Sequence, residues 1–272
     1  ARLMARLHLT VLGGFELRAD LRTIAVPSKK AQALLAYLAL RPGRAHARAT
    51  LVGLLWGDAR EERARHSLRQ VMFRLRQAFA GARNASLVVR GDTVTLDTAA
   101  ISVDALEFQR LLGLGTERAL ETALTIYRGA LLEGVHVDEA PFDEWLQPER
   151  ERLRGAALGA LGRVLDHQMK RGSIAAALQT ATRLLALDPL QEGTHRALMR
   201  LYVQQGRRGD ALRQYQACVG LLRRELDVDP EPETRRLYQE ILQKRALTAS
   251  EPDADPSRGP RRAAARTGHD VR

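Results

Sequence analysis

The sequence predicts two fold classes in one chain: an α+β domain at the N-terminus and an all-α domain of helical repeats after it. Three observations support this division. Apolar residues alternate near the N-terminus and again around residues 87–96, whereas they recur at helical spacing from about residue 104 onward. Positive charge is concentrated in the first part of the chain. In the second part, a short motif recurs with an offset of 34 residues.

The first 26 residues alternate between apolar and polar side chains, which predicts short antiparallel strands. A Gly13-Gly14 pair interrupts them. No G-x-G-x-x-G spacing and no Walker lysine surrounds these glycines, so we expect a hairpin turn or bulge rather than a phosphate loop. The alternating apolar residues are Leu7, Leu9, Val11, Phe15, Leu17, Ile24 and Val26.

Three helices and a hairpin are expected next. Ser28 is a suitable N-cap for the first helix, whose apolar stripe stops at Pro42-Gly43. The second helix is short, begins near Thr50 and ends at Gly57-Asp58, and the third spans residues 61–80. The apolar period then returns to two over residues 86–97, which predicts a β-hairpin with a basic, glycine-containing tip.

The second part of the chain is expected to be helical from about Asp104 onward. Ala177-Leu178, followed by Asp188-Pro189, recurs as Ala211-Leu212, followed by Asp229-Pro230. The first halves are offset by 34 residues, which is the tetratricopeptide period, and the second copy is longer. Such helix pairs stack into a solenoid whose concave face usually holds a protein. The tail from about Thr248 has no periodicity and is expected to be disordered.

Charge identifies the N-terminal domain as a candidate for binding nucleic acid. Of the formal net charge of +11, ten units lie in residues 1–97, which carry 17 Lys and Arg against 7 Asp and Glu. Residues 98–245 are neutral, with 21 charged residues of each sign. Basic side chains that face phosphates release counterions from nucleic acid and so favour binding. An acidic protein or membrane surface would attract the same charge.

The third helix has the side chains that reading DNA requires. Its apolar face must pack on the first two helices and consists of Ala64, Leu68, Val71, Met72, Leu75 and Phe79. On the opposite face, Arg and Gln can bind base edges, Ser can reach bases or phosphates, and Phe can contact a thymine methyl. That face carries Arg63, His66, Ser67, Gln70, Phe73, Arg74 and Gln77, with Arg65, Arg69 and Arg76 on its flanks.

Flanking arginines suit the phosphates on either side of the major groove, and Arg90 at the hairpin tip is placed to reach a sugar-phosphate or an adjacent minor groove. The alternative is a solvated arginine face on an ordinary amphipathic helix. That alternative does not account for the stretch from Arg63 to Val89, which contains arginines but no Asp or Glu. We therefore favour DNA reading.

Strands, three helices and a C-terminal hairpin together form the plan of a winged helix-turn-helix. The run from Leu34 to Gly43, the run from Leu51 to Gly57, and Arg74-Leu75-Arg76 resemble the OmpR-type winged helix. The remainder resembles the bacterial transcriptional activator domain; the segments that carry this resemblance are Val103-Asp104-Ala105, Phe108, Phe142 to Trp145, Glu149 to Leu153, Asp188-Pro189-Leu190 and Gly206 to Tyr215. Together, over residues 7–243, the chain resembles the SARP/AfsR-type regulators, which activate transcription of bacterial gene clusters.

The resemblance implies that the end of the third helix lies in the major groove, and it points to Ser67, Gln70, Phe73, Arg74 and Arg76. One departure concerns the wing, where this chain has Thr93-Val94 in place of the Gly-Tyr pair that is usual in the family. The resemblance also implies paired protomers on repeated half-sites.

Composition and motifs argue against several other function classes. A single cysteine, Cys218, excludes an internal disulfide and a cysteine-rich zinc site. The seven histidines are scattered without metal-ligand spacing, and no catalytic arrangement of Ser, His, Cys and Asp is evident. We therefore expect no enzyme, no cofactor and no metal. No apolar run approaches the ~20 residues of a membrane helix, so we expect a cytoplasmic protein without membrane contact.

The sequence thus predicts an α+β N-terminal winged helix-turn-helix followed by an all-α tetratricopeptide-like helical repeat domain. The expected bounds are 1–97 for the winged helix, 98–245 for the activator domain and 246–272 for the tail, and each domain is expected to have its own core. We expect a transcriptional activator that binds repeated promoter half-sites in double-stranded DNA through residues 61–80 and 86–97.

The helical repeats would contact a second protomer in a homodimer, RNA polymerase, or both. Two alternatives remain. One is a tetratricopeptide-like interaction adaptor whose basic domain docks acidic partners. The other is the regulatory N-terminal part of a larger signalling protein.

Overall fold

The computed structural model divides the chain into two compact units, Ala1–Thr194 and His195–Arg272. We describe each unit by itself. The expected domain boundary between residues 97 and 98 lies inside the first unit. The expected disordered tail lies outside the described residues from residue 249 onward. The structure describes residues 7–26, 28–79, 86–97 and 101–248.

The chain begins with a small sheet. β1 (Leu7–Thr10), β2 (Glu16–Ala19) and β3 (Arg22–Ile24) pair antiparallel in order, as the alternating residues predict. β7 (Ile101–Val103) then returns to pair parallel with β1, which gives the strand order β3-β2-β1-β7. The sequence does not predict this fourth strand, because three residues are too few to reveal an alternating pattern.

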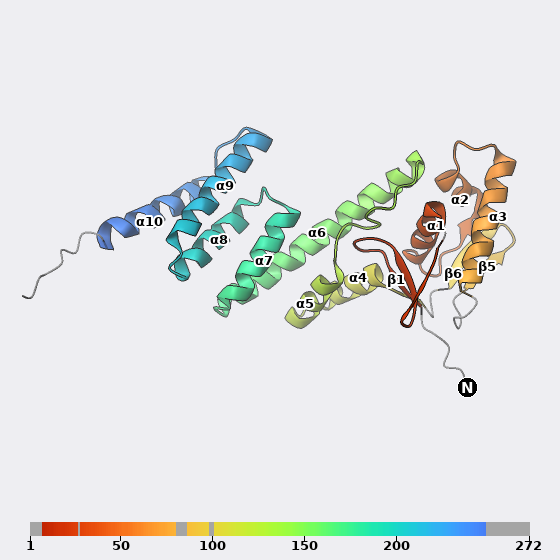
Figure 1. Ribbon diagram of the computed structural model, residues 1–272, viewed down its shortest axis with the longest axis horizontal. Coiled ribbons are helices and arrows are strands. Elements are labelled where there is room, and N and C mark those ends of the chain that lie inside the picture. The colour runs from red at the N-terminus through yellow and green to blue at the C-terminus, as the bar shows by residue number, and fades with distance from the viewer. Residues whose placement is uncertain (1–6, 27, 80–85, 98–100, 249–272) are drawn as a thin grey trace, which may run out of the picture. The chain divides into compact units, whose positions relative to one another are not determined.

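The three helices lie close to their expected positions (Figure 1). α1 (Lys29–Ala39) begins at Ser28, whose hydroxyl accepts a hydrogen bond from the N–H of Ala31 at 3.2 Å and so caps the helix. α2 (Arg48–Leu55) ends before the Gly57-Asp58 turn, and α3 (Glu61–Ala78) follows. The expected N-cap and the extent of all three helices are confirmed, apart from one or two residues at the ends.

The expected hairpin is also confirmed. β5 (Ser86–Arg90) and β6 (Thr93–Asp97) pair antiparallel, with Val89 opposite Val94. A two-residue strand that the sequence does not reveal, β4 (His46–Ala47), pairs with β6 and gives the order β4-β6-β5. Through β4, the hairpin is attached directly to the start of α2.

The first unit continues with four helices: α4 (Asp104–Leu114), α5 (Glu117–Ile126), α6 (Ala140–Lys170) and α7 (Ile174–Leu187). The expectation of uninterrupted helix after Asp104 is wrong for residues 127–139. There Leu131 forms bridges to Leu12 and Gly14 of the N-terminal turn. Buried apolar side chains explain this course, because Leu131, Leu132, Val135 and Val137 all belong to the same core as the residues of β1 and β2.

Close approach of this segment explains the Gly13-Gly14 pair. Gly13 has a positive φ of 82°, and a Cβ atom there would lie 3.0 Å from the backbone of Arg128. The N–H of Gly13 donates to the carbonyl of Ala130 at 3.0 Å. Only glycine meets both conditions at this position, the unusual backbone angle and the lack of space.

One hydrophobic core extends across the expected domain boundary. The same cluster of buried residues runs from Leu7 through the three N-terminal helices to Phe108, Phe142 and Ala157. Eight of the eleven residues of α1 are buried, so this helix needs cover on more sides than α2 and α3 can provide. The expectation that residues 1–97 and 98–245 each have a separate core is therefore wrong.

The second unit contains most of α8 (Glu192–Gln204), together with α9 (Arg208–Leu226) and α10 (Pro232–Thr248). The 34-residue repeat is visible in the backbone, since Gly172 and Gly206 follow α6 and α8 with nearly equal φ values of 71° and 73°. α9 has 19 residues against 14 in α7, which accounts for part of the longer second copy. No described helix combines the length and the apolar character that crossing a membrane requires.

Candidate nucleic-acid interface

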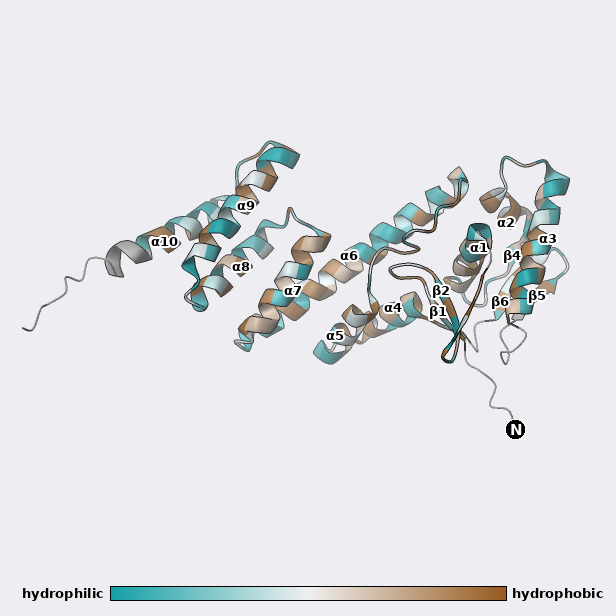
Figure 2. Ribbon diagram, viewed as in Figure 1, coloured by the Kyte–Doolittle hydropathy of each residue, from teal (hydrophilic) through white to brown (hydrophobic). Residues whose placement is uncertain are grey.

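The two faces of α3 differ as expected. Figure 2 shows hydrophilic segments along α3 interspersed with hydrophobic ones. All six residues of the expected apolar face are buried, with exposed fractions of 8% or less. The carboxylates at the start of α3, Glu61 and Glu62, and the positive charge of Arg76 in its last turn also suit the helix dipole. Packing therefore fixes which side of α3 faces outward.

The outward side of α3 carries the side chains that were expected to read DNA. Ser67 is half-buried, whereas the other members of this face are exposed. Phe73 is 60% exposed, which is unusual for an aromatic side chain that has a core available one turn away. The exposed members are Arg63, His66, Gln70, Phe73, Arg74 and Gln77, and the flanking Arg65, Arg69 and Arg76 are exposed as well.

The side chains on this side of α3 differ in their hydrogen-bond and ion-pair partners. Nε2 of His66 and the amide nitrogen of Gln70 lie 2.8 Å apart, so this pair forms one hydrogen-bonded unit on the surface. Arg65 forms an ion pair with Glu61 at 2.5 Å. Arg76 donates to the carbonyl oxygen of Leu87 in β5 at 3.1 Å. Arg76 therefore connects α3 to the hairpin, a role that the sequence did not indicate.

The tip of the hairpin is a tight turn. Gly91 has a φ of 56°, and the Thr93 hydroxyl donates to the carbonyl of Arg90 at 2.9 Å. The N–H of Arg48 donates to the carbonyl of Asp92 at 2.9 Å and attaches the tip to the start of α2. Arg90 itself is exposed at this tip. Val94 replaces the expected family aromatic and is fully buried, so it serves the core.

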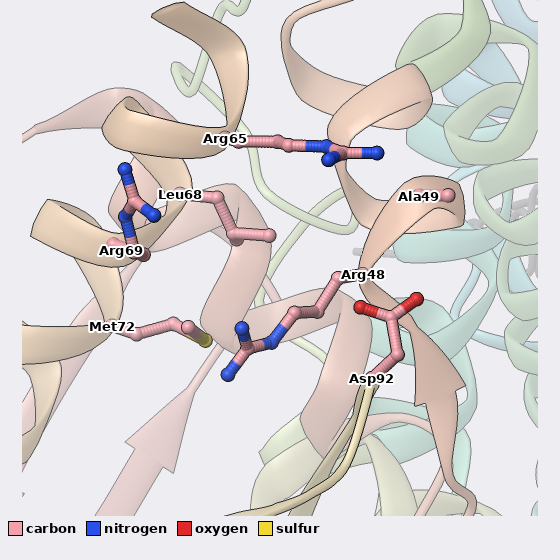
Figure 3. A pocket seen from close by; sticks show the side chains of 7 residues that line it. All are labelled: Arg48, Ala49, Arg65, Leu68, Arg69, Met72 and Asp92. Atoms are coloured by element: carbon pink, nitrogen blue, oxygen red, sulfur yellow. The ribbon is translucent and has the colours of Figure 1, made fainter. Parts of the chain in front are cut away.

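Between α2, α3 and the hairpin tip lies a hollow of about 390 Å³, lined by Arg48, Ala49, Arg65, Leu68, Arg69, Met72 and Asp92. Figure 3 shows the Arg48 side chain reaching from the start of α2 toward Met72 of α3. Nε of Arg48 is buried and has no hydrogen-bond partner among the described residues. The N–H of Arg48 is already bonded to Asp92, but no side chain caps the start of α2, so the amides that follow Arg48 are open to an acceptor.

Three guanidinium groups and a helix N-terminus around one hollow attract a phosphate, while the Asp92 carboxylate opposes it. The sequence did not identify Arg48, because the second helix was expected to begin near Thr50. Its position three residues before Leu51, the first leucine of that helix, is the signal that could have found it.

The buried His46 adds little to the positive field. Burial lowers the pKa of its imidazole, and the charges of Arg41 and Arg44 lower that pKa further. Its ring packs against Tyr37 with 5.2 Å between the ring centroids. His46 is therefore a neutral core residue.

Two family models match successive parts of the chain. The model described as bacterial transcriptional activator domain matches residues 103–242, and the model described as transcriptional regulatory protein, C terminal, matches residues 24–91. The first match alone spans more than half of the chain.

Known proteins resemble the chain over most of its length. It is 32% identical over 246 residues to the regulatory protein AfsR of Streptomyces coelicolor and 28% identical over 240 residues to AfsR of Streptomyces griseus. These alignments cover 87% of this chain but 24% of each AfsR protein, so the chain spans about a quarter of their length. The transcriptional regulator RedD of Streptomyces coelicolor is 31% identical over 237 residues, covering 78% of this chain and 64% of RedD.

A solved structure has the same architecture. Mycobacterium tuberculosis EmbR, in complex with a low affinity phosphopeptide, superimposes with a TM-score of 0.68. The match covers 88% of this chain and 66% of the EmbR chain, at 23% sequence identity. At this identity, the likeness concerns the fold.

Proposed function

The chain belongs to the family of bacterial transcriptional regulators that carry a bacterial transcriptional activator domain, and we propose that it is a sequence-specific activator that binds double-stranded promoter DNA. We propose a regulator rather than an enzyme. The observation that carries the proposal is the outward face of α3. Packing directs arginine, glutamine and an exposed phenylalanine away from the core, on the helix that follows a helix-turn-helix turn.

In this proposal, α3 lies in the major groove and its side chains make different kinds of contact with the DNA. Gln70 and Arg74 are the candidates for base contacts, because amides and guanidinium groups pair with base edges in two-bond geometry. Phe73 offers an apolar contact for a thymine methyl. Arg63, His66, Ser67 and Arg69 surround them on the same face.

The hollow beside α3 supports a second type of contact. Arg48, Arg65 and Arg69 together suit a backbone phosphate of the strand that passes between α3 and the hairpin. Arg90 at the tip is then placed toward the next groove. Phosphate contacts fix the register of the protein on the duplex, while base contacts supply the specificity.

We further propose that the helical half of the chain contacts a second copy of the protein, RNA polymerase, or both. Pairing two protomers would place two α3 helices on half-sites about one helical turn apart, on the same side of the duplex. Linking two binding events in this way raises affinity through effective concentration, without any new base contact.

Selection from a random duplex library with the full chain tests the proposal. We expect enrichment of a repeated motif, and binding to it should weaken with salt at a slope near −5 in log–log form if about six phosphates are neutralised. Arg118→Ala on α5 is the matched control, since it removes one exposed positive charge outside the α3 face. Enrichment of no motif, with salt-sensitive binding to acidic proteins instead, would support the adaptor alternative.

A further inference from the structure

Glu139, directly before α6, holds a buried carboxylate between two elements of the N-terminal half. It is 7% exposed. One carboxylate oxygen accepts a hydrogen bond from Nζ of Lys30 in α1 at 2.6 Å. The other oxygen accepts from the N–H of Gly57 at 3.0 Å. A buried carboxylate is costly unless it is paired and hydrogen-bonded, and this one meets both conditions.

Aromatic contacts reinforce the same junction farther along α6. The Trp145 ring lies 4.9 Å from the Tyr37 ring, edge to face. The Arg41 guanidinium lies 4.3 Å from the Tyr37 ring and 5.2 Å from the Trp145 ring. Glu139 and Trp145 thus hold α1 at its start and at its end. The start of α6 therefore contacts both ends of α1.

Gly57 is the residue through which Glu139 reaches the reading helix. It opens the short turn between α2 and α3, and α3 begins four residues later at Glu61. A Cβ atom at Gly57 would lie 3.2 Å from the Gly53 carbonyl oxygen, so the glycine permits the close approach of this turn. No side chain caps the start of α3. The bond from Gly57 to Glu139 is therefore a specific tether for the turn.

α6 carries this tether away from the DNA-reading half. It has 31 residues, which corresponds to a length of about 46 Å at 1.5 Å per residue. Its later turns pack against α7, the first helix of the repeated motif. One helix therefore connects the turn before α3 with α7.

We propose that Glu139 is a positioning residue for DNA reading: by holding the α2–α3 turn against α6, it fixes the angle at which α3 presents its outward face relative to α6. This inference rests on the proposed function, because α3 must read DNA for the angle to matter. Glu139 touches no DNA itself. It acts through Gly57, while Lys30 neutralises its buried charge.

Two double variants of the full chain isolate the tether from the charge. Lys30→Met with Glu139→Gln removes both charges but keeps an amide oxygen that can accept from Gly57. Lys30→Met with Glu139→Met removes both charges and the acceptor. Removing both partners of a buried ion pair avoids the unpaired charge that a single substitution would leave. The two variants therefore differ in the hydrogen bond to Gly57.

The measurement is the ratio of dissociation constants for a random duplex and for the duplex selected by the wild-type chain. We expect the Glu139→Gln double variant to keep this ratio. The Glu139→Met double variant should lose about tenfold, comparable with one good base contact, and the Gly57 amide should exchange faster with solvent. Thermal unfolding confirms that both variants are folded during the binding assay. A merely structural role would lower the unfolding midpoint without changing the ratio.

Equal ratios for both double variants and the wild type would overturn the inference and leave the proposed function intact. A wild-type chain that does not discriminate between duplexes would overturn the proposed function, and the inference with it. If the Glu139→Met double variant is unfolded, Glu139→Asp takes its place. That substitution keeps both charges, shortens the reach to Gly57 by one methylene, and should give the same loss of discrimination.

Discussion

At the scale of single residues, the bonds that a side chain of α3 already forms within the protein determine which contacts it can make with DNA. Gln70 is oriented by its hydrogen bond to His66, which reduces the freedom that binding would otherwise remove. No hydrogen bond or ion pair joins the Arg74 side chain to another described residue. Arg76 already donates to Leu87. Three neighbouring polar residues are therefore expected to respond differently to substitution.

Arg74→Ala should remove a base contact. We expect a loss of about 1–3 kcal/mol at the selected duplex and a smaller loss on random duplex, so discrimination should fall. Unfolding should be unchanged, because the side chain is exposed. Fluorescence anisotropy with both duplexes measures the effect, and Arg118→Ala is the control. Specific binding that survives Arg74→Ala would mean that another face of α3 enters the groove.

Arg76→Ala should have two effects. If Arg76 meets a phosphate, binding to selected and random duplex should weaken alike, and the salt slope should fall by about one. Because Arg76 also bonds to Leu87, its loss should lower the free energy of unfolding by about 1 kcal/mol. Denaturant titration and binding at several salt concentrations separate the two effects. A lower stability with an unchanged salt slope would assign Arg76 to structure alone.

Asp104 links the two halves of the first unit and carries a pH dependence. Its carboxylate accepts from the N–H groups of Val11 and Leu12 at 2.9 and 3.0 Å, and burial raises its pKa above the ordinary value of 3.8. A raised pKa means that the folded state binds the proton more tightly than the unfolded state does. The contribution of this carboxyl group to the free energy of unfolding is therefore complete below pH 3.8 and is lost as the pH rises through the folded pKa.

We therefore expect the wild type to gain unfolding free energy relative to Asp104→Asn as the pH falls from about 7 toward about 4. Urea unfolding of both proteins over this range provides the measurement. An opposite trend would show that the hydrogen bonds from Val11 and Leu12 outweigh burial at Asp104.

At the scale of elements, arginines stabilise the ends of helices in the first unit. Arg163 donates to the carbonyl of Gly115 after α4 at 2.8 Å. Arg183 donates to the carbonyls of Leu124 and Tyr127 at the end of α5, at 2.7 and 2.6 Å. The last carbonyls of a helix lack partners within the helix and carry its negative dipole end, so a guanidinium there is favourable.

Arg183→Met should therefore cost about 1–3 kcal/mol of unfolding free energy, because it leaves two partly buried carbonyls without their donor. Met keeps much of the apolar stem, so the change isolates the hydrogen bonds. Denaturant unfolding of the full chain measures the loss. A change as small as that of Arg118→Ala would show that water replaces the guanidinium at no cost.

Elements with a strong local signal could be predicted from the sequence. Three such signals each determine structure only a few residues away along the chain. They are the Ser28 cap, the apolar stripes of the three helices and the alternating residues around Arg90. By contrast, β4 and β7 have two and three residues, and each exists because a distant strand pairs with it. Likewise, residues 127–139 form no helix, because Leu131 pairs with the turn after β1 and the segment's leucines and valines join the shared core. Long-range pairing leaves no periodic pattern for a sequence to display.

The candidate interface follows the same division. The α3 face could be predicted because helical geometry alone separates its two sides. Arg48 could not be predicted as part of the interface. Its position depends on α2 beginning two residues earlier than expected and on the hydrogen bond from its N–H to Asp92 at the hairpin tip. The tether from Glu139 to Gly57 joins residues 82 positions apart and has no sequence signature.

At the scale of the whole molecule, the shared core changes what a truncated chain is expected to do. Residues 1–97 contain α3 and most of the net charge, and the sequence predicts that they have a core of their own. The structure shows that β1 also needs β7, that Val11 and Leu12 bond to Asp104, and that the core continues into α6. Residues 1–97 would leave these surfaces exposed to water.

We therefore expect residues 1–97 to unfold or aggregate, whereas residues 1–194, the whole first compact unit, should fold and bind the selected duplex. The shorter truncation exposes apolar surface that is buried in the full chain, and each Å² exposed costs about 25 cal/mol of unfolding free energy. Because the net unfolding free energy of a domain is small, this loss is enough to unfold the fragment. Circular dichroism melting and anisotropy on both truncated chains provide the test. Cooperative melting of residues 1–97 would show that the N-terminal half is an independent domain.

The same two chains separate DNA binding from activation. Residues 1–194 retain α3, the tether at Glu139 and α7, but lack the second unit with α9 and α10. If the second unit provides the contact to a protomer or to RNA polymerase, residues 1–194 should bind the duplex more weakly than the full chain and fail to activate a promoter reporter. Full activation by residues 1–194 would place the activating contact within the first unit, on the surface that α4 to α7 provide.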